Sequence, residues 1–114
     1  MQVKDLLIRQ KNNTQHGIAD NEQCITYAEW HLLSSELSSK IQKLGIHNEC
    51  VVLFLPNSIK YATAYFGILY SENVVVPIDI RAKAPEIAST ICYCEASLII
   101  TDKEHEALVR EALD

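Results

Sequence analysis

Glycine and proline are scarce in this sequence, with three residues of each among 114. The glycines, Gly17, Gly45 and Gly67, lie too far apart to cooperate in one phosphate-binding loop. Neither Gly-x-Gly-x-x-Gly nor Gly-x-x-x-x-Gly-Lys-Ser/Thr occurs, which excludes a dinucleotide cradle and a P-loop. The Gly-x-Ser-x-Gly elbow of one hydrolase class is missing too. The sequence therefore carries no complete motif of these kinds.

Long apolar runs and basic clusters are also missing. No apolar stretch approaches the roughly 18–20 residues that cross a bilayer, and the N-terminus lacks the basic and apolar regions of a signal peptide. We therefore predict a cytoplasmic protein without a membrane span. The 10 basic residues are scattered among 15 acidic ones, for a net charge of −5. This distribution excludes a phosphate-tracking surface, so we predict no nucleic-acid partner.

The cysteines and histidines show no spacing typical of metal ligands. Cys92 and Cys94 form only a pair, whereas a structural zinc site takes four ligands. In a reducing compartment the cysteines stay thiols. A Cys–His nucleophile lacks any recognisable oxyanion site or orienting neighbour. We therefore predict no catalytic, cofactor-binding or metal-binding residue. The residues concerned are Cys24, Cys50, Cys92, Cys94, His16, His31, His47 and His105.

What the sequence does contain is a core. Apolar residues make up 48% of the chain and charged residues 22%, as is typical of one folded domain, here over residues 1–114. Near its start we predict a helix over residues 3–11. A hairpin of strands 16–20 and 23–26 follows.

The next predicted helix opens at Thr26 with a capping box completed by Glu29. It runs to Leu44, and Gly45 supplies the left-handed stop. Its apolar residues recur every three or four positions, which predicts one buried stripe. That stripe is Trp30, Leu33, Leu37, Ile41 and Leu44, and the predicted exposed face is Ser34, Ser35, Ser38, Lys40 and Lys43.

From residue 50 onward strands and helices alternate. The continuous apolar run 50–55 predicts a central parallel strand buried on both faces. Strands at 74–76 and 98–101 follow. The intervening helices begin at Asn57 or Ser58, around Pro85, and after Asp102, and they end near Tyr70, Cys94 and Leu113. This order predicts an α/β fold with a small parallel sheet and helical crossovers. Because its edges lie open, we expect more chain or another subunit to cover them.

Several segments in order resemble adenylate-forming (AMP-binding) enzymes, the superfamily of acyl- and aryl-CoA ligases, peptide-synthetase adenylation domains and luciferases. Ile25-Thr26-Tyr27-Ala28-Glu29 is similar to their "hydrophobic-Thr-Tyr-x-Glu" opening. Val51-Val52-Leu53-Phe54-Leu55-Pro56-Asn57-Ser58 resembles their strand ending in Leu-Pro-Asn-Ser. The stretch 65–79, with Val74-Val75-Val76-Pro77-Ile78-Asp79, and the strand 96–102 continue the resemblance, which covers roughly residues 1–110.

The resemblance implies an enzyme that activates a carboxylic acid with Mg-ATP as an acyl-adenylate and passes the acyl group to CoA or a carrier-protein thiol. Fatty-acid metabolism is one such setting. The phosphate loop, the ribose-binding Asp and the catalytic Lys of the family belong to later motifs that this chain lacks. We therefore transfer no catalytic residue, and expect an N-terminal structural subdomain that is inactive alone.

Two segments depart from the family pattern. Ser71-Glu72-Asn73 replaces Ala-Gly-Ala, and we predict that Asn73 takes over the positive-φ turn of the missing glycine. Lys83 replaces a capping Thr, which weakens the start of the next helix.

Three interpretations stay open at the level of sequence. The chain is the front of a longer ligase, an expectation strengthened by its abrupt end at Asp114, or it is a stand-alone module that completes a split enzyme, or it is an unrelated small α/β binding domain. Its partners are then the remainder of the ligase polypeptide or, for the isolated chain, a second copy in a homodimer. The branch of the family and the acid are not readable.

Overall fold

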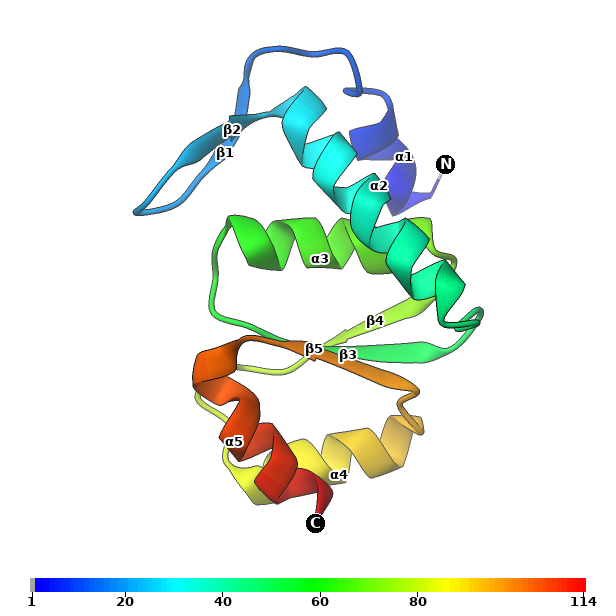
Figure 1. Ribbon diagram of the computed structural model, residues 1–114, viewed down its shortest axis with the longest axis vertical. Coiled ribbons are helices and arrows are strands. Elements are labelled where there is room, and N and C mark those ends of the chain that lie inside the picture. Colours follow the sequence, from blue (N-terminus) through cyan, green and yellow to red (C-terminus); the bar gives the residue numbers. More distant parts are fainter. Residues whose placement is uncertain (1) are drawn as a thin grey trace.

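The computed structural model describes residues 2–114 as three layers, with the sheet between two sets of helices (Figure 1). Helices α1, α2 and α3 lie on one side of the sheet and α4 and α5 on the other. The helices are α1 (Val3–Ile8), α2 (Tyr27–Lys43), α3 (Ile59–Tyr70), α4 (Ala84–Cys94) and α5 (Lys103–Leu113). The strands are β1 (His16–Ala19), β2 (Cys24–Thr26), β3 (Cys50–Phe54), β4 (Val74–Pro77) and β5 (Leu98–Thr101).

The sheet of β3, β4 and β5 is parallel, with β3 in the centre. Cys50 pairs with Val74 on one side, and Val51 pairs with Leu98 on the other. Residues 51–54 are fully buried, as the continuous apolar run predicts for a strand covered on both faces. The fold class predicted from the sequence, a small parallel sheet with helical crossovers, is confirmed. The antiparallel β1–β2 hairpin is confirmed as well.

Alternate residues of β3 supply two separate cores, because successive side chains of a strand point to opposite faces. Val51 and Leu53 pack with Ile41 and Ile68 beneath α2 and α3. Val52 and Phe54 pack with Ile87 and Val109 beneath α4 and α5. The central strand thus holds both helical layers together.

The predicted helix starts are confirmed in detail. Thr26 Oγ1 accepts from the Glu29 backbone N–H at 3.1 Å, and the Glu29 carboxylate accepts from the Thr26 N–H at 2.9 Å. Ser58 caps α3 through the Tyr61 N–H, and Asp102 caps α5. Lys83 gives no side-chain cap, so only the bond from its N–H to Glu86 supports the start of α4.

The predicted burial of α2 is partly wrong. Leu33 and Leu44 of the expected core stripe are 38% and 64% exposed, whereas Ser34 and Ser38 are 0% and 6% exposed. A close crossing of α2 and α3 accounts for the buried serines, because it favours small side chains between the backbones. A Cβ added at Gly67 of α3 would lie 2.8 Å from Leu37 Cδ2.

The turn before β4 also differs from the prediction. Glu72, not Asn73, takes the left-handed conformation, with φ of 62°. The buried Asn73 side chain instead accepts from the Glu49 N–H at 3.0 Å and donates to the Ile46 carbonyl at 3.2 Å. These bonds link the loop before β3 to the loop before β4 and hold Asn73 in place. The left-handed conformation is therefore adopted by the preceding residue, Glu72.

The first helix is shorter than the expected range 3–11, since α1 ends at Ile8. The following turns close by tighter i to i−3 bonds, from Gln10 N–H to the Leu7 carbonyl and from Lys11 N–H to the Ile8 carbonyl. Such tightening is common where a short helix runs into polar turn residues.

Candidate functional site

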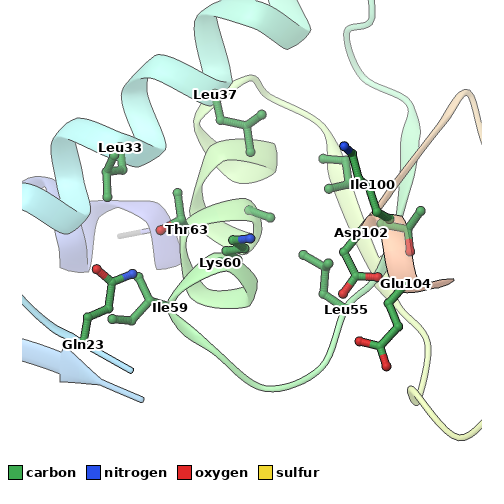
Figure 2. A pocket seen from close by; sticks show the side chains of 13 residues that line it. Gln23, Leu33, Leu37, Leu55, Ile59, Lys60, Thr63, Ile100, Asp102 and Glu104 are labelled. Atoms are coloured by element: carbon green, nitrogen blue, oxygen red, sulfur yellow. The ribbon is translucent and has the colours of Figure 1, made fainter. Parts of the chain in front are cut away.

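A groove of about 740 Å³ lies at the carboxyl end of the sheet. We call it the α2–α3 groove, because these helices form one wall and β5 with the start of α5 forms the other (Figure 2). It is lined by Gln23, Leu33, Leu37, Leu55, Ile59, Lys60, Thr63, Ala64, Ile100, Thr101, Asp102, Lys103 and Glu104.

The floor of the groove is apolar because of how the sheet is covered. Leu53 and Ile100 are paired in register and point toward the α2–α3 layer. Leu53 is fully buried, but Ile100 lies on the outer strand and is only partly covered. Leu33 faces the same space from α2 and is 38% exposed. Among residues 2–114, β5 pairs only with β3, so one of its edges is open beside this apolar surface.

Polar groups form the rim of the groove. Lys60, Asp102 and Glu104 lie there with Gln23 of the hairpin (Figure 2). Thr63 Oγ1 is buried in the wall and has no hydrogen-bond partner within the described part of the chain. An apolar floor with a polar rim is the usual anatomy of a protein interface. The groove therefore offers an apolar surface that another protein segment could cover.

The hairpin is fastened to the groove through one carboxylate. Asp20 Oδ2 accepts from the Ile59 backbone N–H at 3.0 Å, and Oδ1 accepts from the N–H groups of Glu22 and Gln23. The bond to Ile59, followed by those to the two turn residues, lowers the pKa of Asp20. The ionised carboxylate thus both closes the hairpin turn and holds it against the start of α3.

Asp102, Glu104 and His105 gather at the start of α5, where each offers a ligand atom within 4.8 Å of the others. Asp102 Oδ1, however, already accepts from the His105 backbone N–H at 3.0 Å and contacts His105 Nδ1 at 2.6 Å. Burial alone would raise the pKa of Asp102, but the bonds and charge of His105 lower it. The His105 ring packs edge-on against Phe54. Helix capping and packing explain this cluster without an ion.

Two of the three glycines of the described residues are placed where they cannot serve a phosphate loop for Mg-ATP. Phosphate loops use closely spaced glycines whose N–H groups face the ligand. Here Gly67 is buried against Leu37, and Gly45 adopts φ of 77° at the end of α2, so both have structural roles. The prediction that this chain holds no catalytic, cofactor-binding or metal-binding residue stays a prediction.

The histidines considered from the sequence are dispersed over the fold, whereas two of the cysteines, Cys50 and Cys94, lie at the same end of the sheet. All four cysteines are free, with Cys24 and Cys92 exposed and Cys50 and Cys94 partly buried. His31 Nδ1 lies 2.9 Å from the hydroxyl of Tyr70, and burial raises the pKa of that phenol to about 12. Burial, with the charge of Lys11, lowers the pKa of His31. This pair is a neutral contact between α2 and α3.

Sequence reasoning missed the groove because it placed Leu33 in the core. The available signal was the pair of adjacent leucines, Leu32 and Leu33, because together they extend the apolar side chains of the helix beyond the single predicted stripe.

None of the helices within residues 2–114 is long and apolar enough to cross a bilayer.

Comparison with known proteins gives the family. The AMP-binding enzyme family matches residues 8–114. The chain is 32% identical over 80 residues to 4-coumarate–CoA ligase 4 of Arabidopsis thaliana, covering 69% of this chain and 14% of that ligase. It is 28% identical over 87 residues to syringomycin synthase SyrB1 of Pseudomonas syringae pv. syringae, covering 75% of this chain and 14% of the synthase.

The solved structures agree on the fold. A complex of VinN with L-aspartate superposes with a TM-score of 0.91 at 23% identity, over 98% of this chain and 30% of VinN. The chain thus spans only a small part of each relative. With the family matched over nearly its whole length, this chain belongs to the AMP-binding enzyme family.

Proposed function

We propose that residues 1–114 are a single, partial N-terminal subdomain of an ATP-dependent acid–thiol ligase, which activates a carboxylic acid as an acyl-adenylate. In this proposal the chain supplies structure and the later part of the polypeptide supplies the chemistry. Mg-ATP and CoA, or a carrier-protein thiol, would bind to that later part. The chain alone is inactive.

The observation that carries the proposal is the α2–α3 groove beside the open edge of β5. An apolar surface of this kind, joined to an unpaired strand edge, calls for more protein to cover it. The curated relatives named above are several times longer than this chain, which covers 14% of each. We propose that later segments of the same ligase polypeptide fill the groove and extend the sheet at β5.

The test is ATP–pyrophosphate exchange with the purified chain. We expect no exchange above a blank without enzyme, whichever carboxylic acid is supplied, because the chain has no phosphate loop. A panel of 4-coumarate and L-aspartate samples the acids that the names of the similar proteins above contain, with 4-coumarate–CoA ligase 4 of Arabidopsis thaliana as the positive control. Exchange by the chain itself would overturn the proposal.

A second candidate is an interaction module that completes a split adenylation enzyme, favoured by the same groove. Co-purification of a separately encoded polypeptide that carries the phosphate loop, with exchange only in the complex, would support this second candidate over the first.

The thiol that accepts the acyl group is a further question, since both CoA ligases and syringomycin synthase SyrB1 resemble the chain. CoA or carrier-protein acylation by the complete ligase answers it. Fatty-acid metabolism and the cytoplasmic location stay predictions.

A further inference from the structure

Two of the four cysteines come from distant parts of the chain to the same end of the sheet. Cys50 is the first residue of β3, and Cys94 is the last residue of α4. By the alternation of the strand, Cys50 shares its face with Val52 and Phe54, which point toward α4 and α5. Cys94 packs against that same core cluster. The two thiols therefore belong to one side of the sheet.

The turn after α4 holds Cys94 next to the start of β3. Glu95 adopts φ of 52°, and the Ala96 N–H bonds back to the Ile91 carbonyl at 3.2 Å, which closes the end of the helix. The Ser97 N–H then donates to the Cys50 carbonyl at 3.0 Å. In addition, Ser97 Oγ donates to the Glu49 carboxylate at 2.6 Å. These bonds fix the backbone on both sides of the contact.

The side chains of Cys50 and Cys94 are both partly buried at this end of the sheet. Cys94 Sγ lies 3.9 Å from the Ile91 carbonyl oxygen and points along the end of its helix. Burial raises the pKa of Cys94, and the adjacent Cys50 thiol raises it further. The two other cysteines, Cys24 and Cys92, are exposed. They provide internal controls for any chemistry of the pair.

We propose that Cys50 and Cys94 form a dithiol modification site, which a small-molecule disulfide such as oxidised glutathione converts into an internal disulfide. One protein thiol loses its proton, and its sulfur attacks the glutathione disulfide; that S–S bond breaks, and one glutathione thiolate leaves. The second protein sulfur, likewise deprotonated, attacks the protein sulfur of the mixed disulfide and displaces the other glutathione. Two protein thiols are oxidised, and one glutathione disulfide is reduced to two thiols.

The bond would lock the end of α4 to the start of the central strand. It would close a long loop of chain containing α3 and β4, and cross-links of this kind stabilise a fold mainly by restricting its unfolded state. In a reducing compartment the pair stays open. A shift toward oxidising conditions therefore closes it, and glutathione or thioredoxin-type reductants open it again.

The test is oxidation of the folded 114-residue chain with oxidised glutathione, followed by blocking of free thiols and non-reducing peptide mapping. We expect a peptide joining Cys50 to Cys94, with a mass two hydrogen atoms below the sum of the two free peptides, and a higher Tm. The cross-link should be lost in Cys94→Ser and kept in the matched control Cys92→Ser. Oxidation in concentrated urea should spread over other pairings.

Two results would overturn the proposal. One is a native chain in which Cys50 and Cys94 end as separate glutathione adducts, or as free thiols, while Cys92 reacts. The other is a cross-link that joins Cys92 to Cys94. Both results are measured by peptide mapping of the parent chain, so the outcome does not depend on whether a cysteine variant folds.

Discussion

Glu72 is a non-glycine residue held in the left-handed backbone region, at the corner between α3 and β4. An L-residue with a Cβ pays roughly 1–2 kcal/mol for this conformation. Its carboxylate forms an exposed ion pair with Lys4 of α1, and exposed pairs of this kind contribute about 0–1 kcal/mol. The corner is therefore strained by its side chain and only partly compensated.

Replacing Glu72 by glycine isolates that strain when it is compared with Glu72→Gln. Both variants lose the ion pair, but only glycine adopts positive φ without steric cost. We expect Glu72→Gly to be more stable than Glu72→Gln by about 1 kcal/mol in urea unfolding. Equal midpoints for the two variants would show that the corner is not strained.

Leu53 is fully buried at the centre of β3. Leu53→Asp would place a charge without a partner between the strands and the α2–α3 layer, at a cost of several kcal/mol against a total stability of about 5–15 kcal/mol. We expect this variant to be unfolded by circular dichroism and thermal melting. Cys92→Ser, at an exposed position, should melt like the parent chain. A cooperative melt of Leu53→Asp would contradict the central placement of the strand.

At the scale of elements, the close crossing of α2 on α3 depends on small residues. Gly67 faces Leu37. The hydroxyl of the buried Ser34 donates a hydrogen bond to the Trp30 carbonyl at 2.8 Å. The Trp30 indole N–H donates to the Ala62 carbonyl at 3.2 Å, so a side chain of α2 also bonds the backbone of α3. The two helices therefore approach closely where Gly67 of α3 receives the Leu37 side chain of α2.

Gly67→Ala tests this crossing. Alanine is the better helix former by about 1 kcal/mol, but its Cβ would lie within 3.0 Å of three Leu37 atoms. We expect net destabilisation of about 1–2 kcal/mol, as is typical of overpacking. In the double variant with Leu37→Ala, the added methyl should no longer be destabilising. A Gly67→Ala variant more stable than the parent would contradict the close approach.

The hairpin depends on the ionised form of Asp20. Because the folded pKa of Asp20 is below its unfolded value of 3.8, its contribution is fully present above that value. The contribution is lost as the pH falls through the folded pKa. We expect Asp20→Asn to be less stable than the parent at pH 6 and to approach it near pH 2 in urea unfolding. A difference that does not depend on pH would contradict a role for the charge.

The order and type of the elements were predictable because each rests on local chemistry. The caps at Thr26, Ser58 and Asp102 and the apolar run of β3 all act within a few residues of sequence. What could not be predicted depends on tertiary contact. The burial of Ser34 and the turn at Glu72 follow from how α2 meets α3 and how Asn73 bridges two loops. The groove likewise depends on tertiary structure, because it lies beside β5, a strand that pairs on one edge only within the described residues.

At the scale of the whole molecule, exposed apolar side chains are spread over the surface, and one of them, Leu33, lines the α2–α3 groove beside an open strand edge. The α2–α3 groove adjoins the open edge of β5, whereas hydrophobic residues elsewhere, such as Tyr93 and Leu113, are exposed on the α4–α5 side. Monomeric proteins seldom expose continuous apolar patches beyond a few hundred Å². In the complete ligase proposed above, later segments would cover this surface. In the isolated chain only a second copy, or the chain's own ends, can do so.

We therefore predict that the isolated chain dimerises through the groove, by strand addition at β5 or exchange of an end helix. The opposing effect is the net charge of −5, which favours a soluble monomer. Light scattering over a concentration series should show a mass that rises toward that of a dimer.

Leu33→Lys should keep the chain monomeric, because its side chain lies in the groove and is already 38% exposed. Leu32→Lys, at a neighbouring position that is 57% exposed and outside the groove, should leave association unchanged. A monomeric mass for the parent chain at every concentration would contradict the prediction, as would equal effects of the two leucine variants.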